Sequence, residues 1–171
     1  MKTAIAIVTL LVGSGTTVVA LPALMPASGT VVARASDPHE GSQNLEPIAG
    51  LQPLFPDVPP GGYPHDTYAW GNCTWWVAFN RPVPPYLGDG WQWLANGAAA
   101  GMPTSSQPSV GAIVVYRPSQ GYDPARGHVA VVVEVGPTSF RVSEMNYVGL
   151  GRVSERDSPW PDWHVEGFLP R

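Results

Sequence analysis

The chain has 171 residues, enough for one domain of ordinary size with residues to spare. Its 9 Lys and Arg against 13 Asp and Glu give a net charge of -4 without any basic run, so we expect no nucleic-acid partner. A single cysteine excludes an intramolecular disulfide and any zinc site built on paired cysteines. The 44% hydrophobic content can fill a core, whereas 20 Pro and 19 Gly predict extensive loops or linkers.

Residues 1–26 have the pattern of a targeting segment. No residue from Thr3 to Ala33 is charged, and the apolar run at 4–12 follows Lys2. This pattern indicates a signal peptide, and a membrane anchor is the alternative because the uncharged stretch is long enough to span a bilayer. Glycine, serine and threonine at 13–17 dilute the apolar run and favour the signal peptide. In both cases we expect the rest of the chain to be extracytoplasmic, either secreted or tethered to the membrane.

Residues 27–62 are predicted to be a Pro-rich disordered tether, because prolines recur and no apolar residues repeat at a regular spacing. A spacer and a trimmed pro-region are both consistent with this composition. All aromatic residues except Phe55 lie at or after Tyr63. Residues 63–171, about 109 in number, are therefore the predicted folded domain.

Within this domain, predicted helices precede predicted strands. Residues 73–80 fit a helix with Asn72 as N-cap and Cys73 in the first turn, and a second helix is predicted from Asp89 to Gly101. Apolar and β-branched runs predict four strands, at 112–116, 129–135, 140–145 and 165–169. This order predicts an α+β fold in which the cysteine-bearing helix packs on an antiparallel sheet.

Polar residues stand at the ends of two predicted strands. Alternation along 140–146 places Glu144 and Asn146 on one face, about 6 to 7 Å apart. His128 opens the preceding strand, and a hairpin would bring it beside them. In an antiparallel pair the residue numbers of partners have a constant sum, and a simple four-residue loop gives 275, which turns His128 to the wrong face. We predict an even sum such as 274, because a slip of one residue turns every side chain over.

These residues are sufficient for nucleophilic cleavage of an amide. A helix N-terminus and a nearby imidazolium favour the thiolate of Cys73, His128 can protonate the leaving amine, and a third polar group can fix the imidazole tautomer. The backbone N–H of Cys73 can stabilise the developing oxyanion. From the residues alone, a buried inert or cross-linking cysteine and an ordinary edge histidine remain alternatives. His65 and Asp66, without a further cluster, do not predict a metal site.

Four blocks of the domain resemble the CHAP family in the family's order: 68–78 (YAWGNCTWWVA), 108–114 (PSVGAIV), 127–132 (GHVAVV) and 142–147 (VSEMNY). The family comprises cysteine- and histidine-dependent amidohydrolases and peptidases related to NlpC-type and papain-like enzymes. The resemblance implies a papain-like fold and a thiol-dependent hydrolase. It also implies Cys73 as nucleophile, His128 as general base and acid, Glu144 as the group that orients His128, and Asn146 as an assisting residue.

The resemblance further implies bacterial peptidoglycan as substrate. The cleaved bond would be the one between muramic acid and its peptide, as in an N-acetylmuramoyl-L-alanine amidase, or one within the peptide, as in an endopeptidase. Two other functions remain: a non-catalytic cell-wall binding or assembly factor, and an amidase for small peptide conjugates.

The chain departs from many family members in lacking a recognisable wall-binding module, and we expect it to be a monomer. Some relatives bind calcium through clustered acidic residues near the cysteine. Asp66 by itself, shortly before Cys73, does not make such a site, so we predict no required metal or cofactor.

Overall fold

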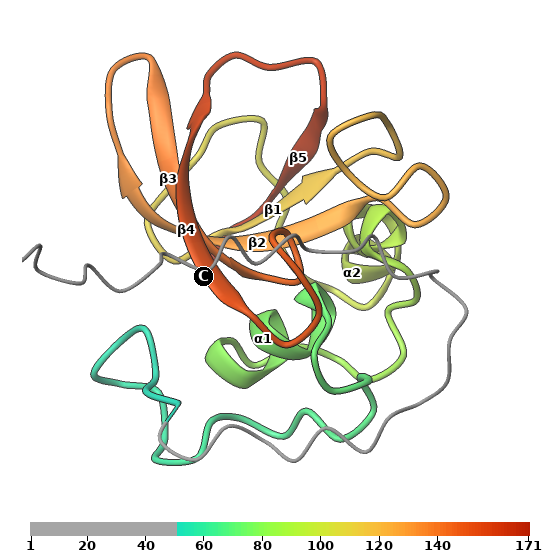
Figure 1. Cartoon of the computed structure of the whole chain (residues 1–171), viewed down its shortest axis with the longest axis vertical. Helices are drawn as coiled ribbons and strands as arrows, with labels where there is room; N and C mark the ends of the chain where they lie inside the picture. Colours follow the sequence, from blue (N-terminus) through green and yellow to red (C-terminus); the bar gives the residue numbers. More distant parts are fainter. Residues whose placement is uncertain (1–50) are drawn as a thin grey trace, which may run out of the picture. The chain divides into compact units, whose positions relative to one another are not determined.

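A computed structural model describes residues 51–171 (Figure 1). The predicted signal or anchor segment at 1–26 and residues 27–50 of the predicted tether lie outside the described residues. Within 51–171, none of the helices has both the length and the apolar character needed to cross a membrane.

Two short helices precede the sheet. Helix α1 covers Cys73–Asn80, and the 3-10 helix η1 (Gly90–Gln92) leads directly into α2 (Trp93–Ala99). The N–H of Asp89 donates to the side chain of Gln92 at 2.8 Å, which secures the start of this second helical segment. Gly101 has a φ of +89°, the left-handed conformation in which helices commonly end. Both predicted helices are confirmed, and the second differs in beginning with a 3-10 turn.

One antiparallel sheet follows, with strand order β4-β3-β2-β1-β5. Its strands are β1 (Ile113–Tyr116), β2 (His128–Val135), β3 (Ser139–Met145), β4 (Val153–Pro159) and β5 (Val165–Leu169). The predicted α+β class and the four predicted strands are confirmed. Strand β4 was not predicted, because its sequence, VSERDSP, is polar and ends in proline. It forms an edge of the sheet, where such a composition is tolerated.

The β2–β3 hairpin contains both registers considered from the sequence. Next to the turn, Val135 pairs with Phe140, a sum of 275. A β-bulge between Val132 and Glu134 then changes the sum to 274, and Val132 pairs with Val142. The even register predicted for the start of β2 is confirmed. The extra residue, Val133, reconciles the short turn with a His128 side chain on the Glu144 face.

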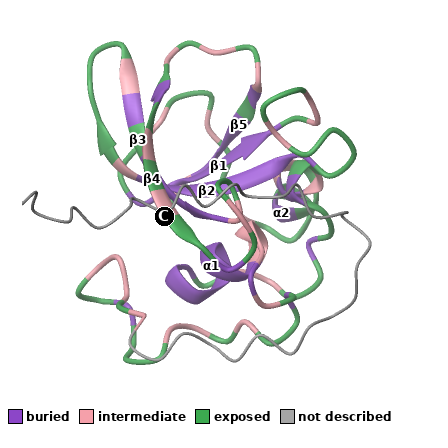
Figure 2. Cartoon of the chain, viewed as in Figure 1, coloured by how far each residue is buried: buried purple, intermediate pink, exposed green. Residues whose placement is uncertain are grey.

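Alternation along the strands divides the core between the two faces of the sheet. On one face, side chains of β1, β2 and β3 pack against α1 and α2, with Ile113, Val131 and Met145 fully buried. The opposite face has its own apolar cluster, which includes Val114 and Phe168. Figure 2 shows α1 and most of β1 and β2 as buried. The site described below lies where β2 begins and β3 ends.

Residues 51–62, which the sequence assigns to the tether, pack on the domain. Leu51, Leu54 and Phe55 contact the helix-side core, and Val58 is buried. The N–H of Leu54 donates to the side chain of Asn80 at 2.8 Å. The domain boundary expected at Tyr63 therefore lies further toward the N-terminus, because irregular chain can bury apolar side chains without any periodic pattern.

Candidate active site

Cys73 is the first residue of α1, and its free thiol is partly buried. Asn72 occupies the predicted N-cap position with extended backbone angles, although its side chain makes no capping hydrogen bond. That side chain instead donates to the carbonyl of Ala69 at 3.2 Å and accepts from Nδ2 of Asn146 at 3.2 Å. The residue before the thiol is therefore held from two sides.

The Cys73 thiol and the His128 imidazole interact across 55 residues of sequence. Burial raises the pKa of Cys73, but the charge of His128, its hydrogen bond and backbone hydrogen bonds at Val129 and Thr74 outweigh burial and lower it. For His128, burial lowers the pKa, while the charges and hydrogen bonds of Cys73 and Glu144 raise it to about 9. The two shifts together favour a thiolate–imidazolium pair near neutral pH.

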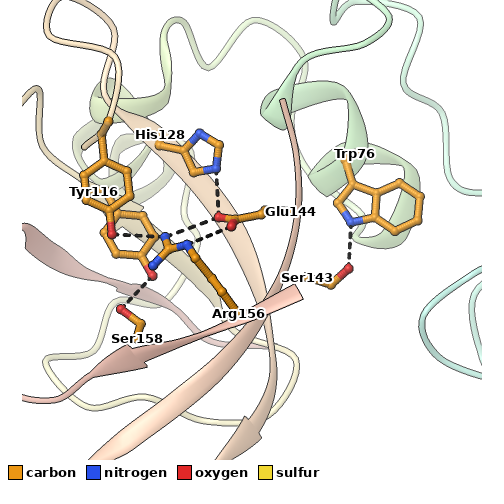
Figure 3. Close-up of polar contacts among 8 residues, drawn as sticks. Trp76, Tyr116, His128, Ser143, Glu144, Arg156 and Ser158 are labelled. Atoms are coloured by element: carbon orange, nitrogen blue, oxygen red, sulfur yellow. Dashed lines mark hydrogen bonds and ion pairs between the residues drawn. The ribbon is translucent and has the colours of Figure 1, made fainter. Parts of the chain in front are cut away.

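Glu144 holds the other side of the imidazole. Nε2 of His128 donates to Oε2 of Glu144 at 3.0 Å, and both residues are buried (Figure 3). Because the carboxylate engages Nε2, Nδ1 is the ring nitrogen left for the thiol. The structure thus brings together Cys73, His128 and Glu144, three of the four predicted site residues, with the imidazole in the middle.

The side-chain amide of Asn146, the fourth predicted residue, is directed to the start of α1. This residue follows the end of β3 with a φ of +65°, so the alternation that would aim its side chain at His128 is interrupted. Its amide reaches Asn72 instead. Asn146 therefore contacts the residue that precedes Cys73.

Arg156 of β4 is a site residue that the sequence analysis missed. Its Nε donates to Oε1 of Glu144 at 2.7 Å, and its Nη2 donates to Oε2 of Glu144 at 3.3 Å and to the Tyr122 hydroxyl at 3.0 Å. Its guanidinium lies over the ring of Tyr147, 4.3 Å from the centroid. To predict the role of Arg156 from the sequence, one would first have to predict strand β4, and the polar composition of that strand resembles a loop.

The backbone before His128 has room only for glycine. Gly127 has a φ of +62°, and a Cβ there would lie 2.4 Å from the carbonyl oxygen of Tyr116 and 2.9 Å from Cβ of Trp91. Trp91 and Tyr147 are both exposed near this point, and the Tyr147 ring lies 6.0 Å from that of His128. Aromatic side chains therefore flank the imidazole.

His65, the other sequence candidate, packs its ring against Trp75 at 4.6 Å and belongs to the helix-side core. Over residues 51–171, His, Cys, Asp and Glu side chains do not gather in any group of three suited to a metal ion. The expectation of no required metal stays a prediction.

Comparison with known proteins finds a matching family and a similar solved structure. Residues 63–146 match the CHAP domain family. A solved structure of an N-acetylmuramoyl-L-alanine amidase from Staphylococcus aureus is similar, with a TM-score of 0.50 and 35% identity over 54% of this chain. The matched part is 28% of that amidase, so this chain spans well under a third of its length. The family match and the agreement in fold show that residues 63–146 contain a CHAP domain and that this domain has the papain-like α+β fold.

Proposed function

We propose that this domain hydrolyses amide bonds in bacterial peptidoglycan through a thiolate at Cys73. The observation that carries the proposal is the position of Cys73 as the first residue of α1, beside an imidazole that Glu144 holds at 3.0 Å; the charge and hydrogen bond of His128 lower the pKa of the thiol. Reactive cysteines lie at helix N-termini and next to cationic groups, whereas structural cysteines lack both features. The arrangement supports a nucleophile over a buried structural thiol.

In the proposed mechanism, the Cys73 thiolate attacks the carbonyl carbon of the scissile amide. Negative charge develops on the carbonyl oxygen, and the N–H of Cys73, which has no intrahelical acceptor at this helix position, can stabilise it. The imidazolium of His128 donates its proton to the leaving nitrogen, the C–N bond breaks, and a thioester remains. Neutral His128 then takes a proton from water, whose oxygen attacks the thioester and releases the acid and the thiolate.

Two further residues have positioning roles in this proposal. Glu144 fixes the ring orientation of His128 and stabilises its positive charge. Asn146 holds Asn72, and through it the backbone on which Cys73 sits. Neither residue exchanges a proton with the substrate.

The similar amidase favours the bond between muramic acid and L-alanine as the one cleaved. Endopeptidase cleavage within the peptide is the second candidate, because the family includes peptidases and the thiolate chemistry is the same. Digestion of purified peptidoglycan and defined muropeptides, followed by mass spectrometry of the products, distinguishes the amidase from the endopeptidase. An amidase separates the muramic acid from the whole peptide, whereas an endopeptidase cuts within the peptide. Hydrolysis of small peptide conjugates without hydrolysis of peptidoglycan or muropeptides would instead support an amidase for small peptide conjugates.

The Cys73→Ala variant tests the chemistry directly. We expect peptidoglycan hydrolysis to fall by at least about 10³-fold, because the nucleophile is lost while the fold is retained. Circular dichroism provides the folding control. Full activity in C73A would refute the proposal, and peptidoglycan binding without products from the native chain would favour a binding or assembly factor.

We also infer an extracytoplasmic location, secreted or membrane-tethered, from the apolar segment at 1–26. Fractionation of cells expressing the full chain, with N-terminal sequencing of the product, tests this inference. An extracellular chain lacking about the first 26 residues supports a signal peptide. An intact chain in the membrane fraction supports an anchor, and an intact chain in the cytosol contradicts both.

A further inference from the structure

Arg156 and Glu144 form a buried two-pronged ion pair on the face of the sheet that carries His128. Strand pairing aligns Arg156 with Val142, and Glu144 lies two residues further on the same face. The Arg156 side chain is 19% exposed and that of Glu144 is 0% exposed. The guanidinium engages both carboxylate oxygens through Nε and Nη2. Such a fork fixes the plane of the carboxylate as well as its position.

This pairing decides which oxygen serves the imidazole. Oε1 of Glu144 accepts the shorter bond from Arg156, at 2.7 Å, whereas Oε2 accepts from Nε2 of His128 at 3.0 Å. A carboxylate held by His128 alone could rotate and present either oxygen. The fork leaves one orientation, and with it one orientation of the imidazole toward Cys73.

The charges along the cluster also balance. A thiolate, an imidazolium, a carboxylate and a guanidinium follow one another from Cys73 through His128 and Glu144 to Arg156, and their sum is zero. Without the guanidinium, the largely buried set would carry one net negative charge, which a low-dielectric environment disfavours. Cys73 would then keep its proton, because a neutral thiol removes the excess negative charge from the cluster.

The tyrosines around Arg156 add no further charge to this cluster. Tyr116 from β1, Tyr122 from the β1–β2 connection and Tyr147 after β3 surround the guanidinium, with ring centroids 5.2, 5.2 and 4.3 Å from it. Burial raises the pKa of Tyr116 and Tyr122, so both stay neutral. The nearby carboxylate of Asp162 is engaged by His164 at 2.7 Å.

We propose that Arg156 is a positioning residue that acts through Glu144: it fixes the carboxylate toward His128 and balances the charge that lets Cys73 remain a thiolate. This proposal rests on the proposed nucleophilic role of Cys73. A lysine could supply the charge of Arg156 but not the planar fork, so charge and geometry can be separated experimentally.

The test is the pH dependence of Cys73 alkylation by iodoacetamide, with circular dichroism to verify folding. In Arg156→Met we expect the acid limb of alkylation to move up by about one pH unit, so the rate on that limb falls about tenfold. Arg141→Met is the matched control, because Arg141 is an exposed arginine paired with a carboxylate on the same two strands. We expect the control to leave the limb unchanged.

The double variant Glu144→Gln/Arg156→Met restores a net charge of zero. We expect its acid limb to return toward that of the native chain. A role of Arg156 confined to stability predicts instead that the acid limb stays in place in both folded variants, since the ionisation of Cys73 would then not depend on the charge of the cluster. An acid limb in R156M equal to the native limb, or a double variant shifted as far as R156M, overturns the proposal.

Arg156→Lys keeps the proposal testable if R156M fails to fold. We expect R156K to retain the acid limb and to lose about tenfold in the rate of amide hydrolysis, because the charge stays and the fork is lost. Unchanged hydrolysis by folded R156K contradicts the positioning role. Alkylation does not involve peptidoglycan, so failure of the proposed substrate and failure of the proposed role of Arg156 give different results.

Discussion

Strands β3 and β4 carry two arginine–carboxylate pairs of nearly equal length in contrasting environments. Arg141 and Asp157 lie 2.9 Å apart with side chains 43% and 63% exposed, whereas Arg156 and Glu144 lie 2.7 Å apart with side chains 19% and 0% exposed. Position along β3 accounts for the difference: Arg141 lies next to the β2–β3 turn and is exposed, whereas residues 142–145, on both faces of the strand, are buried. Distance alone therefore says little about an ion pair, and burial determines what its loss would cost.

The largest effect is expected at His128, the residue that the buried Arg156–Glu144 pair orients. Replacing His128 with Ala should lower amide hydrolysis by about 10³-fold or more, because the proton donor for the leaving nitrogen is lost. Steady-state kinetics on a defined muropeptide measures this loss. His164→Ala is the matched control, because His164 also contacts a carboxylate, that of Asp162 at 2.7 Å. A comparable loss of activity in H128A and H164A would show that His128 has no specific role in the chemistry of Cys73.

Glu144→Gln comes next, with an expected loss in kcat of about 10²-fold, since the amide orients His128 but does not balance its charge. The pKa of His128 should fall below about 9, so the alkaline limb of the rate should move to lower pH. Rates measured from pH 5 to 10 test the shift. An alkaline limb that stays in place would remove Glu144 from the proposed mechanism.

The same variant affects stability. In the folded chain the pKa of His128 is raised from 6.5 to about 9, so its contribution is fully present below pH 6.5 and is lost as the pH rises through 9. In E144Q, the free energy of unfolding should fall less between pH 6.5 and 9 than it does in the native chain. At neutral pH it should also lower the free energy of unfolding by about 3 kcal/mol, because Arg156 is left unpaired in a largely buried position. Urea unfolding across this range measures both effects.

The smallest effect is expected at the exposed pair. Asp157→Asn should leave the melting temperature and the pH profile of hydrolysis unchanged, because solvent screens the pair and the side chains are free to move. Differential scanning fluorimetry and the pH series above test this. A clear destabilisation would mean that geometry, and not burial, determines the worth of these two pairs.

Much of the fold was predictable because its signals are local. The helix at 73–80 and the strands that carry His128 and Glu144 follow from periodicity and from β-branched runs. The parity argument predicts an even register, and Val131 and Val132 have it. It could not locate the bulge at Val133, since an unpaired residue in a strand of valines has no signature of its own.

Strand β4 and Arg156 were not predictable in this way. An edge strand needs few apolar residues, and the polar run at 153–159 has the composition of a loop. Partnership with Glu144 arises from pairing between strands and not from spacing along the chain. Residues 51–62 were missed for a related reason, because irregular chain that packs on a core shows no periodicity.

The sequence by itself determined the CHAP match over residues 63–146, the α+β class and the chemical types of the site: one thiol at a helix start, one imidazole at a strand start and one carboxylate at a strand end. These features depend on residue identity and local pattern. Only the tertiary structure decided that the amide of Asn146 bonds Asn72, and that Arg156 pairs with the Glu144 carboxylate. The physical reason is that burial and cross-strand register, which determine the worth of a charge, exist only once the strands have paired.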